Sequence, residues 1–257
     1  MTDAFDALAA DYDQTFTHSV VGRAQRSAIT RRLAARFAAG DRVLEIGCGT
    51  GEDALALVRR GVRVAATDPS AAMLEVARAK AQAAGLADRL TLRRLAAEAL
   101  DTLPHDARYD GAFSSFGALN CAPDLRPVAQ ELGRLVRPGG WVVLCLLGRW
   151  VPWEWLWFLL RLKPRTAARR LSPSGVTWRT SAVRYPPLRA VRRIFAPSFR
   201  LARTSGIGVL VPPSYAEGWA KRHPRLIAAL ASAEKRLETL PPIARLGDHV
   251  LLELERR

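Results

Sequence analysis

The stretch of residues 43–53, VLEIGCGTGED, decides the fold of this chain. Its first four residues, VLEI, are apolar except for Glu45, a pattern typical of a buried strand. The glycines at 47–51 follow in a turn where the backbone can approach a ligand closely, because glycine has no side chain. Residues 53–60 then read as a helix, whose first amides favour negative charge. A strand, a glycine turn and a helix in this order predict a ligand site at the strand end.

An acidic residue, Asp68, follows about 20 residues on, at the end of the next apolar run, where a carboxylate can accept both hydroxyls of a ribose. Dinucleotide sites favour the spacing G-x-G-x-x-G, which seats a pyrophosphate on the helix. Here the spacing is G-x-G-x-G, and Glu45 precedes it inside the strand. A carboxylate at Glu45 suits a ligand with an ammonium group and repels a pyrophosphate.

This combination resembles the class I S-adenosylmethionine (SAM) methyltransferases, and three further motifs extend the likeness. Residues 109–116, YDGAFSSF, resemble the fourth strand of that family, and residues 135–140, LVRPGG, resemble its turn into the fifth strand. Residues 5–13, FDALAADYD, resemble the opening of the UbiE/BioC-like (type 11) branch. The motifs cover residues 1–148 in the order of the family. Any other α/β domain with a glycine-rich turn is the general alternative.

Strands that alternate with helices predict βαβ units and a parallel sheet. The expected strands lie at 42–47, 62–67, 90–95, 110–114, 141–147, 200–205 and 249–254, and the expected helices at 21–39, 52–60, 70–84, 124–135, 186–195 and 215–239. The resemblance implies an α/β Rossmann-like fold with a seven-stranded, mostly parallel sheet, helices on both faces and an antiparallel last strand. Helical insertions are expected after strand five and before the last strand.

We expect a single methyltransferase domain over residues 1–257. Its predicted parts are an N-terminal helical lid at 1–40, a SAM-binding core at 41–148, and a basic, Trp-rich substrate and lid half at 149–257 that contains the final strands.

The resemblance also implies roles for residues of the glycine turn and its surroundings, with SAM as cofactor and S-adenosyl-L-homocysteine as product. Glu45 is expected to hold the amino group of SAM, and Gly47 and Gly49 to pass under its methionine portion. Asp68 is expected to bind the ribose hydroxyls, and Ser114 to offer its carbonyl oxygen to the ammonium group. Cys48 is expected in the same turn, as a small packing residue rather than a catalytic thiol.

The other implied cofactor contacts lie outside the turn. Tyr12 is expected to close over the methionine end, and Pro69 and Met73 to follow Asp68 toward the adenine face. Ala97 and Glu98 are expected at the adenine edge. The chain departs from the family just before them, where the family often has Asp and this chain has Ala96.

Catalysis in such enzymes is mostly alignment of a nucleophile with the sulfonium methyl group, so a dedicated base is optional. His18 in the N-terminal segment and Tyr215 in the second insertion are the candidates for a base or a pocket residue. Surface or capping roles are the alternative for His18 and His223, and His249 lies in a predicted strand, where a structural role is expected.

The net charge of +15 belongs almost entirely to one half of the chain. Residues 1–147 hold 18 Lys and Arg against 17 Asp and Glu, and residues 148–257 hold 21 against 7.

The three cysteines show no metal-like spacing, so no metal site is predicted, and they fit a reducing cytoplasm. Residues 1–19 are polar and acidic, so no signal peptide is expected. We therefore expect a cytoplasmic protein, either free or peripheral at the inner face of the membrane.

Residues 149–171, RWVPWEWLWFLLRLKPRTAARRL, crowd four tryptophans among arginines. The apolar run is too short and interrupted to span a bilayer. Tryptophans flanked by arginines suit an anionic membrane surface or a lipid-lined pocket, so residues 149–180 are a candidate membrane contact. A helical lid, whose tryptophans pack on the sheet or on a second subunit, is the alternative.

The favoured hypothesis is methyl transfer from SAM to a small or lipid-like organic acceptor. An RNA- or ribosome-directed methyltransferase is the alternative that the basic half suggests, although the N/D-P-P-Y element of enzymes that methylate base amines is absent after strand four. A SAM-binding protein without catalysis and a NAD-binding oxidoreductase are the remaining hypotheses. The acceptor atom (O, N or C) and the oligomeric state stay open at this point.

Overall fold

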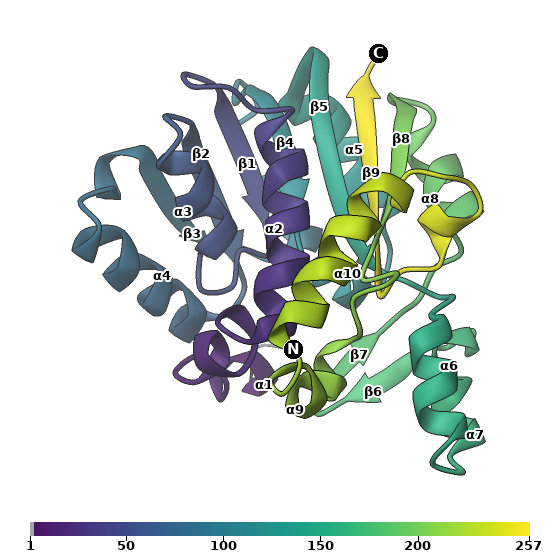
Figure 1. Ribbon diagram of the computed structural model, residues 1–257. Coiled ribbons are helices and arrows are strands. Elements are labelled where there is room, and N and C mark those ends of the chain that lie inside the picture. Colours follow the sequence, from purple (N-terminus) through teal and green to yellow (C-terminus); the bar gives the residue numbers. More distant parts are fainter. Residues whose placement is uncertain (1–2) are drawn as a thin grey trace.

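Seven strands form one central sheet in the computed structural model, which describes residues 3–257 (Figure 1). The strands are β1 (Arg42–Ile46), β2 (Arg63–Asp68), β3 (Leu90–Arg94), β4 (Tyr109–Ser114), β5 (Val136–Leu147), β8 (Phe199–Ile207) and β9 (His249–Arg256). Their order across the sheet is β3-β2-β1-β4-β5-β9-β8. All seven predicted strands therefore form, and they form one sheet.

The strand directions confirm the predicted topology. Strands β1 to β5 pair in parallel, and β9 pairs antiparallel with β5 on one side and with β8 on the other. Strand β5 begins earlier than predicted, because residues 136–140 already follow β4, with a register shift before Gly111 pairs with Trp141. The Rossmann-like fold with an antiparallel last strand is thus confirmed.

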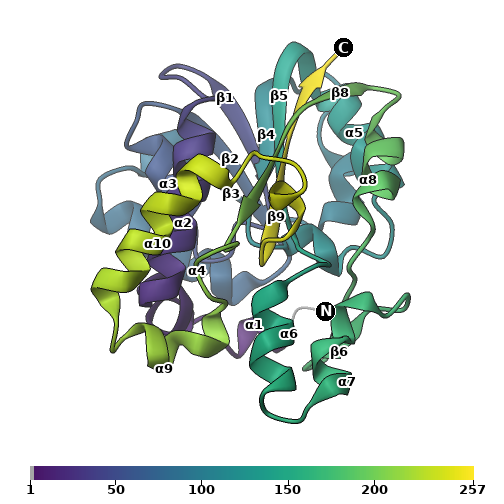
Figure 2. The ribbon, with the colours of Figure 1, turned by 45° about the vertical axis from the view of Figure 1, so that its right-hand side comes forward.

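Helices cover both faces of the sheet, and each layer closes one hydrophobic core (Figures 1 and 2). One layer holds α2 (Val20–Ala34), α3 (Glu52–Val58) and α4 (Ala71–Ala83). The other holds η3 (Ala97–Thr102), α5 (Arg126–Leu135) and α8 (Leu188–Phe195). Strand side chains alternate between the two cores, because successive residues of a strand point to opposite faces.

Local capping explains where the helices begin. The Ser70 hydroxyl accepts a hydrogen bond from the Met73 amide at 3.1 Å, so α4 starts where the sequence predicts. Helix α2 ends at Ala34, five residues before the predicted end at Ala39. Beyond Ala34 the chain passes into a turn that closes with the bond from the Phe37 amide to the Leu33 carbonyl at 2.9 Å, and Phe37 is buried against Phe113, with ring centroids 6.1 Å apart.

The second half adds further elements, most of which lie below the carboxyl ends of the parallel strands, whereas its last long helix runs alongside α2 (Figure 1). They are α6 (Pro152–Leu159), α7 (Pro164–Ala167), the hairpin of β6 (Val176–Trp178) and β7 (Ser181–Val183), α9 (Glu217–Ala220) and α10 (Pro224–Leu237). The hairpin was not predicted, because its strands are too short to show a pattern. The helix predicted at 215–239 is broken before Pro224, which lacks the amide that would continue it. Helix α10 packs on α2 rather than on the sheet.

Short helical turns complete the chain. They are α1 (Asp3–Asp6), η1 (Asp13–Thr17), η2 (Ala87–Arg89), η4 (Ala118–Cys121), η5 (Arg169–Leu171), η6 (Ser214–Ala216) and η7 (Ile243–Arg245). The predicted lid at 1–40 thus corresponds to α1, η1 and α2, with residues 1–2 outside the described part. Within residues 3–257, no helix is both long and apolar enough to cross a bilayer.

Candidate functional site

The glycine turn after β1 is held by the neighbouring strand. The amides of Gly47 and Cys48 donate to the Thr67 carbonyl of β2, at 2.8 and 2.9 Å. Gly47 has a φ of 73°, and a Cβ at this position would lie 2.3 Å from the Cβ of Ala118. Only glycine fits here, because both the left-handed backbone and the close approach exclude a side chain.

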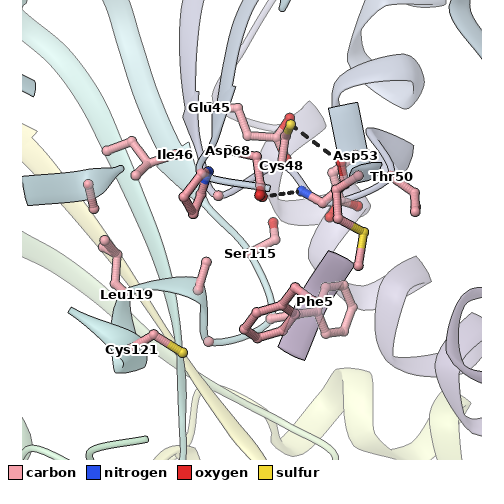
Figure 3. Close-up of a pocket in the computed structure, with 18 of the residues that line it drawn as sticks. Phe5, Glu45, Ile46, Cys48, Thr50, Asp53, Asp68, Ser115, Leu119 and Cys121 are labelled. Atoms are coloured by element: carbon pink, nitrogen blue, oxygen red, sulfur yellow. Dashed lines mark hydrogen bonds between the residues drawn. The ribbon is translucent and has the colours of Figure 1, made fainter. Parts of the chain in front are cut away.

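Asp68 is fixed at the rim of this turn (Figure 3). One carboxylate oxygen accepts from the Gly49 amide at 2.8 Å, and the other accepts from the Ser70 amide at 2.9 Å. Burial raises the pKa of Asp68 above its ordinary value, although these two amide bonds oppose the shift. Each oxygen keeps a second lone pair, so the carboxylate is oriented by the protein and can still accept hydroxyl groups.

Among the carboxyl groups of the site, Glu45 has the least compensation for its burial from hydrogen bonds and ion pairs. It is 1% exposed, and its Oε2 atom has no hydrogen-bond partner within residues 3–257. Burial raises the pKa of Glu45 well above its ordinary value, with further upward contributions from Asp53 and Asp68. A buried polar atom without a partner costs about 1–3 kcal/mol. A cationic donor at this position would remove that cost.

These residues line one cavity at the carboxyl ends of β1, β2 and β4 (Figure 3). Its empty space, including the part open to solvent, is about 1010 Å³. Ten of the eleven predicted cofactor residues line it, namely Tyr12, Glu45, Gly47, Cys48, Gly49, Asp68, Pro69, Met73, Ala97 and Glu98. Ser114 does not line the cavity, and its hydroxyl donates to the Ile46 carbonyl at 2.8 Å. Its neighbour Ser115 lines the cavity instead.

The charge of the cavity is strongly one-sided. Five carboxylates line it, those of Glu45, Glu52, Asp53, Asp68 and Glu98, against the single guanidinium of Arg26. Arg26 is already paired with Asp53 at 2.7 Å. A cavity lined mostly by one sign of charge attracts ligands of the opposite sign. This arrangement therefore favours a cationic ligand and opposes a pyrophosphate.

Aromatic rings of the N-terminal segment and of the turn after β4 close one side of the cavity. Tyr12, Phe5 and Phe116 all line it. The guanidinium carbon of Arg26 lies 4.4 Å from the centroid of the Phe116 ring, which is a cation–π contact. Burial, with the carboxylates nearby, raises the pKa of Tyr12 to about 12. Tyr12 is therefore a neutral phenol at pH 7, able to donate a hydrogen bond.

The candidate catalytic residues lie outside this lining. His18 is exposed, and its carbonyl oxygen accepts from Arg23. Tyr215 packs against Trp157 and Phe158, and burial raises the pKa of its hydroxyl. The His223 Nδ1 lies 2.9 Å from the carbonyl oxygen of Trp219 in the preceding turn. Neither His18 nor Tyr215 is thus brought beside the predicted cofactor residues.

His249 lies at the sheet edge that faces the cavity. It is buried at the start of β9, opposite Leu147, and burial lowers the pKa of its imidazole. Its ring meets the Phe116 ring edge-on at 5.4 Å. Because Phe116 lines the cavity, the imidazole supports the cavity wall from behind.

The tryptophans of residues 149–171 pack inward more than the sequence suggests. Trp153 donates its indole N–H to the Leu210 carbonyl at 3.0 Å, Trp155 meets Trp150 edge-on, and Trp157 packs on Tyr215. Trp150 remains 48% exposed. The exposed apolar surface of this segment consists mainly of leucines. Two of its four tryptophans, Trp153 and Trp157, hold α6 against η6, α9 and the residues just before them.

Sequence reasoning missed several residues that line the cavity, above all Arg26 and Phe116. Arg26 lies in a helix with many other arginines, and no local pattern marks the one that faces inward. Phe116 belongs to a stretch that resembles a strand, whereas the backbone turns here with a φ of 49°. Asp53 could have been found from the sequence, because it lies in the first turn of the helix that follows the glycine turn. Within residues 3–257, no group of three His, Cys, Asp or Glu side chains is arranged as metal ligands.

Comparisons with known proteins agree with this geometry. Residues 43–140 match a family model described as a methyltransferase domain. A demethylmenaquinone methyltransferase of Clavibacter sepedonicus is 37% identical over 143 residues, which are 55% of this chain and 55% of that protein. A ubiquinone biosynthesis O-methyltransferase of Leptothrix cholodnii is 36% identical over 110 residues, which are 43% of this chain and 46% of that protein.

The chain thus spans about half the length of the curated relatives it matches. Among solved structures, geranyl diphosphate C-methyltransferase from Streptomyces coelicolor superposes with a TM-score of 0.59 at 18% identity, over 90% of this chain and 79% of that one. At this identity the likeness concerns the fold alone.

Proposed function

We propose that this chain is a class I SAM-dependent methyltransferase of the UbiE-like type, which binds SAM in the carboxylate-lined cavity and transfers its methyl group to a small or lipid-like organic acceptor. The observation that carries the proposal is the buried, unpartnered carboxyl group of Glu45 in a cavity with five carboxylates and one guanidinium. SAM brings an ammonium and a sulfonium, and both charges suit this lining.

The residues of the cavity would divide the cofactor between them. Glu45 would accept from the ammonium group, and Asp68 from the ribose hydroxyls. Met73 and Glu98 would lie at the adenine. When bound there, SAM would supply an electrophilic methyl group on its sulfonium to an electron pair of the acceptor. The protein contributes mainly the alignment of these two reactants.

The acceptor side of the cavity supports an organic acceptor with apolar character. Phe5, Phe116, Leu119 and Ala122 line it beside the charged residues. Two relatives are named demethylmenaquinone methyltransferase and ubiquinone biosynthesis O-methyltransferase, and these names support an acceptor of this class. O-, N- and C-methylation all require the same alignment, so the proposal names the acceptor class and leaves the atom to experiment.

The test is transfer of a radiolabelled methyl group from SAM into a lysate of the host cell, fractionated into organic, nucleic-acid, protein and water-soluble phases. Asp68→Ala provides the blank, because it removes the ribose contact. Label in the organic phase above this blank is expected. Label confined to RNA would refute the acceptor class, and failure of the wild-type protein to bind SAM in a calorimetric titration would refute the cofactor. A parallel titration with NAD tests the dinucleotide alternative.

As its partner surface we propose an anionic membrane, which residues 149–180 would contact. The turn from α6 to α7 exposes leucines to solvent: Leu156, Leu159, Leu160 and Leu162 have exposed fractions of 54, 52, 74 and 90%. Leu162 also has a φ of 56°, a left-handed conformation that costs a residue with a Cβ atom about 1–2 kcal/mol. A strained leucine that is 90% exposed contributes little to packing within this chain.

Positive charge surrounds these leucines. Arg161, Lys163 and Arg165 are exposed on the same turn, and the sequence holds no Asp or Glu between Glu154 and Glu217. Glu154 itself is buried and paired with Arg170 at 2.8 Å. Apolar side chains ringed by cations are the chemistry of an interfacial contact with anionic lipid. The turn lies at the same end of the molecule as α1 and the carboxyl ends of the parallel strands (Figure 2).

Vesicle sedimentation tests this contact independently of methyl transfer. Binding to vesicles of phosphatidylcholine with phosphatidylglycerol is expected, with little binding to phosphatidylcholine alone. Leu160→Glu should abolish it, whereas Leu226→Glu, at an exposed leucine of α10, should not. Equal binding of both variants would overturn the assignment to this turn. Self-association that disappears in Leu160→Glu would identify the surface as a dimer contact instead.

A further inference from the structure

A second cavity lies at the far side of β5 from the cofactor residues. Arginines from three separate segments line it: Arg149 after β5, Arg189 in α8 and Arg245 in η7. No carboxylate lines it, and its empty space, including the part open to solvent, is about 1040 Å³. We call it the arginine cavity. Its charge is opposite to that of the cavity described above, where carboxylates dominate.

The three guanidinium groups have no counter-ion in the described chain. None of them forms an ion pair within residues 3–257, and Arg149 alone is oriented, by donating to the Leu171 carbonyl at 2.9 Å. The carboxylates nearest to this end of β5 and β9 already form ion pairs with other arginines. Glu154 binds Arg169 and Arg170, and Asp248 binds Arg170 at 2.7 Å.

The floor of the arginine cavity is apolar. Leu146 of β5, Val250 of β9 and Leu188 of α8 line it, and all three belong to or pack against the core on that face of the sheet. Trp150 lines the rim and is 48% exposed. Unpaired guanidinium groups bind phosphate and carboxylate oxygens, often by two parallel hydrogen bonds. An indole beside them offers a face for an apolar or flat group.

From this combination we propose that the arginine cavity is a second ligand site, which binds an amphiphilic organic anion. Its phosphate or carboxylate group would lie among Arg149, Arg189 and Arg245, and its apolar part would cover Leu146, Val250 and Trp150. An inorganic anion would bind the arginines but leave the apolar floor exposed to solvent. An organic anion would also bury that floor, so we expect it to bind more tightly than free phosphate.

The site is separate from the cofactor cavity but shares a wall with it. The Leu147 amide, at the end of β5, donates to the Asn120 side chain at 2.9 Å. A Cβ at Gly117 would lie 2.7 Å from the Cγ of Leu147. Leu147 lines the arginine cavity and Gly117 lines the cofactor cavity, so one layer of residues divides them. An occupant of one cavity therefore touches the wall of the other.

Calorimetric titration of the full chain with decyl phosphate, below its micelle concentration, tests the proposal. Inorganic phosphate and decanol are titrated in parallel to separate the contribution of the anion from that of the apolar chain. Saturable binding of decyl phosphate is expected, at least tenfold tighter than that of either parallel ligand. Arg189→Ala and Arg245→Ala should each weaken it about tenfold, as expected when one charge-assisted hydrogen bond is removed.

Arg192→Ala is the matched control, because Arg192 is exposed on α8, forms no ion pair within the described residues, and does not line the cavity. It changes the net charge equally and should leave the affinity unchanged. Equal weakening by all three variants would mean diffuse attraction by the basic half and would overturn the proposal. If inorganic phosphate bound as tightly as decyl phosphate, the proposal that the ligand is amphiphilic would be wrong. If decyl phosphate showed no saturable binding, the proposal that the cavity is a ligand site would be wrong. All readouts are independent of SAM and of methyl transfer.

Discussion

Replacement of Glu45 by Gln should stabilise the fold and weaken the cofactor site at the same time. Burial raises the pKa of Glu45, so the folded chain holds its proton at a pH where the unfolded chain has released it. As pH rises above the ordinary value of 4.5, this difference in proton binding lowers the free energy of unfolding of the wild-type protein until the folded-state pKa is passed. Glutamine has no proton to release, so the variant escapes this destabilisation.

The magnitude follows from the proton that the folded wild-type chain retains. Each pH unit between the unfolded-state pKa and the folded-state pKa of Glu45 costs the wild-type protein about 1.4 kcal/mol, and a glutamine amide at this buried position carries no such cost. In a chain of this size, each kcal/mol raises the melting temperature by about 2–4 °C. Removal of the charge-assisted hydrogen bond to the ammonium group of SAM costs about 1.5–3 kcal/mol, which is roughly ten- to hundredfold in Kd.

The assay is differential scanning calorimetry from pH 4 to 8 without SAM, together with calorimetric titration with SAM at pH 7.5. The stability advantage of Glu45→Gln should grow with pH and vanish toward pH 4. Glu75→Gln, at an exposed position of α4, is the control for the chemical change and should alter neither quantity. A Glu45→Gln protein that melts below the wild type at pH 8 and binds SAM as tightly would refute both the burial argument and the assigned role.

Three further changes test other parts of the structure. Asp68→Ala should weaken SAM binding by about 1–3 kcal/mol for each ribose hydroxyl left without its acceptor, with the fold intact by circular dichroism; unchanged affinity in titration would remove Asp68 from the site. Gly47→Ala should abolish SAM binding and lower the melting temperature, because the new Cβ would lie 2.3 Å from the Cβ of Ala118 and the backbone has a φ of 73°. Gly218→Ala is the control and should do neither, because open space surrounds Gly218. Arg170→Met should destabilise the chain by about 3–5 kcal/mol in denaturant unfolding, because Asp248 would stay buried without its cation, while Glu154 would keep only Arg169. A destabilisation below about 1 kcal/mol would contradict this.

Much of the fold and of the cofactor site could be predicted from local sequence. Residues 43–53 specify a strand, a turn and a helix through short-range rules, because glycine conformations, caps and apolar periodicity act within a few residues. Asp68 could be placed beside them because parallel strands end at the same edge of a sheet. Ten of eleven predicted cofactor residues therefore line one cavity. Ser114 does not line the cavity, whereas its neighbour Ser115 does, and the predicted role of the Ser114 carbonyl oxygen stays a prediction.

Other features depend on contacts between distant segments, which no local pattern encodes. The pairing of Arg26 with Asp53, the support of Phe116 by His249, and the union of Arg149, Arg189 and Arg245 around one cavity each join residues far apart in the chain. The sequence showed that the second half is basic, but not which arginines are neutralised by buried carboxylates. It also suggested tryptophans as the exposed surface of α6, where the tertiary structure exposes leucines instead.

The sequence by itself thus determined the sheet, the glycine turn and the acidic cofactor residues, because these follow from local backbone preferences and from the regular geometry of βαβ units. Only the tertiary structure decided which charges remain unpaired, which apolar side chains stay exposed, and that two cavities of opposite charge share the wall at Leu147. The reason is physical: burial and ion pairing are properties of the packed chain, since each depends on which distant segment lies opposite.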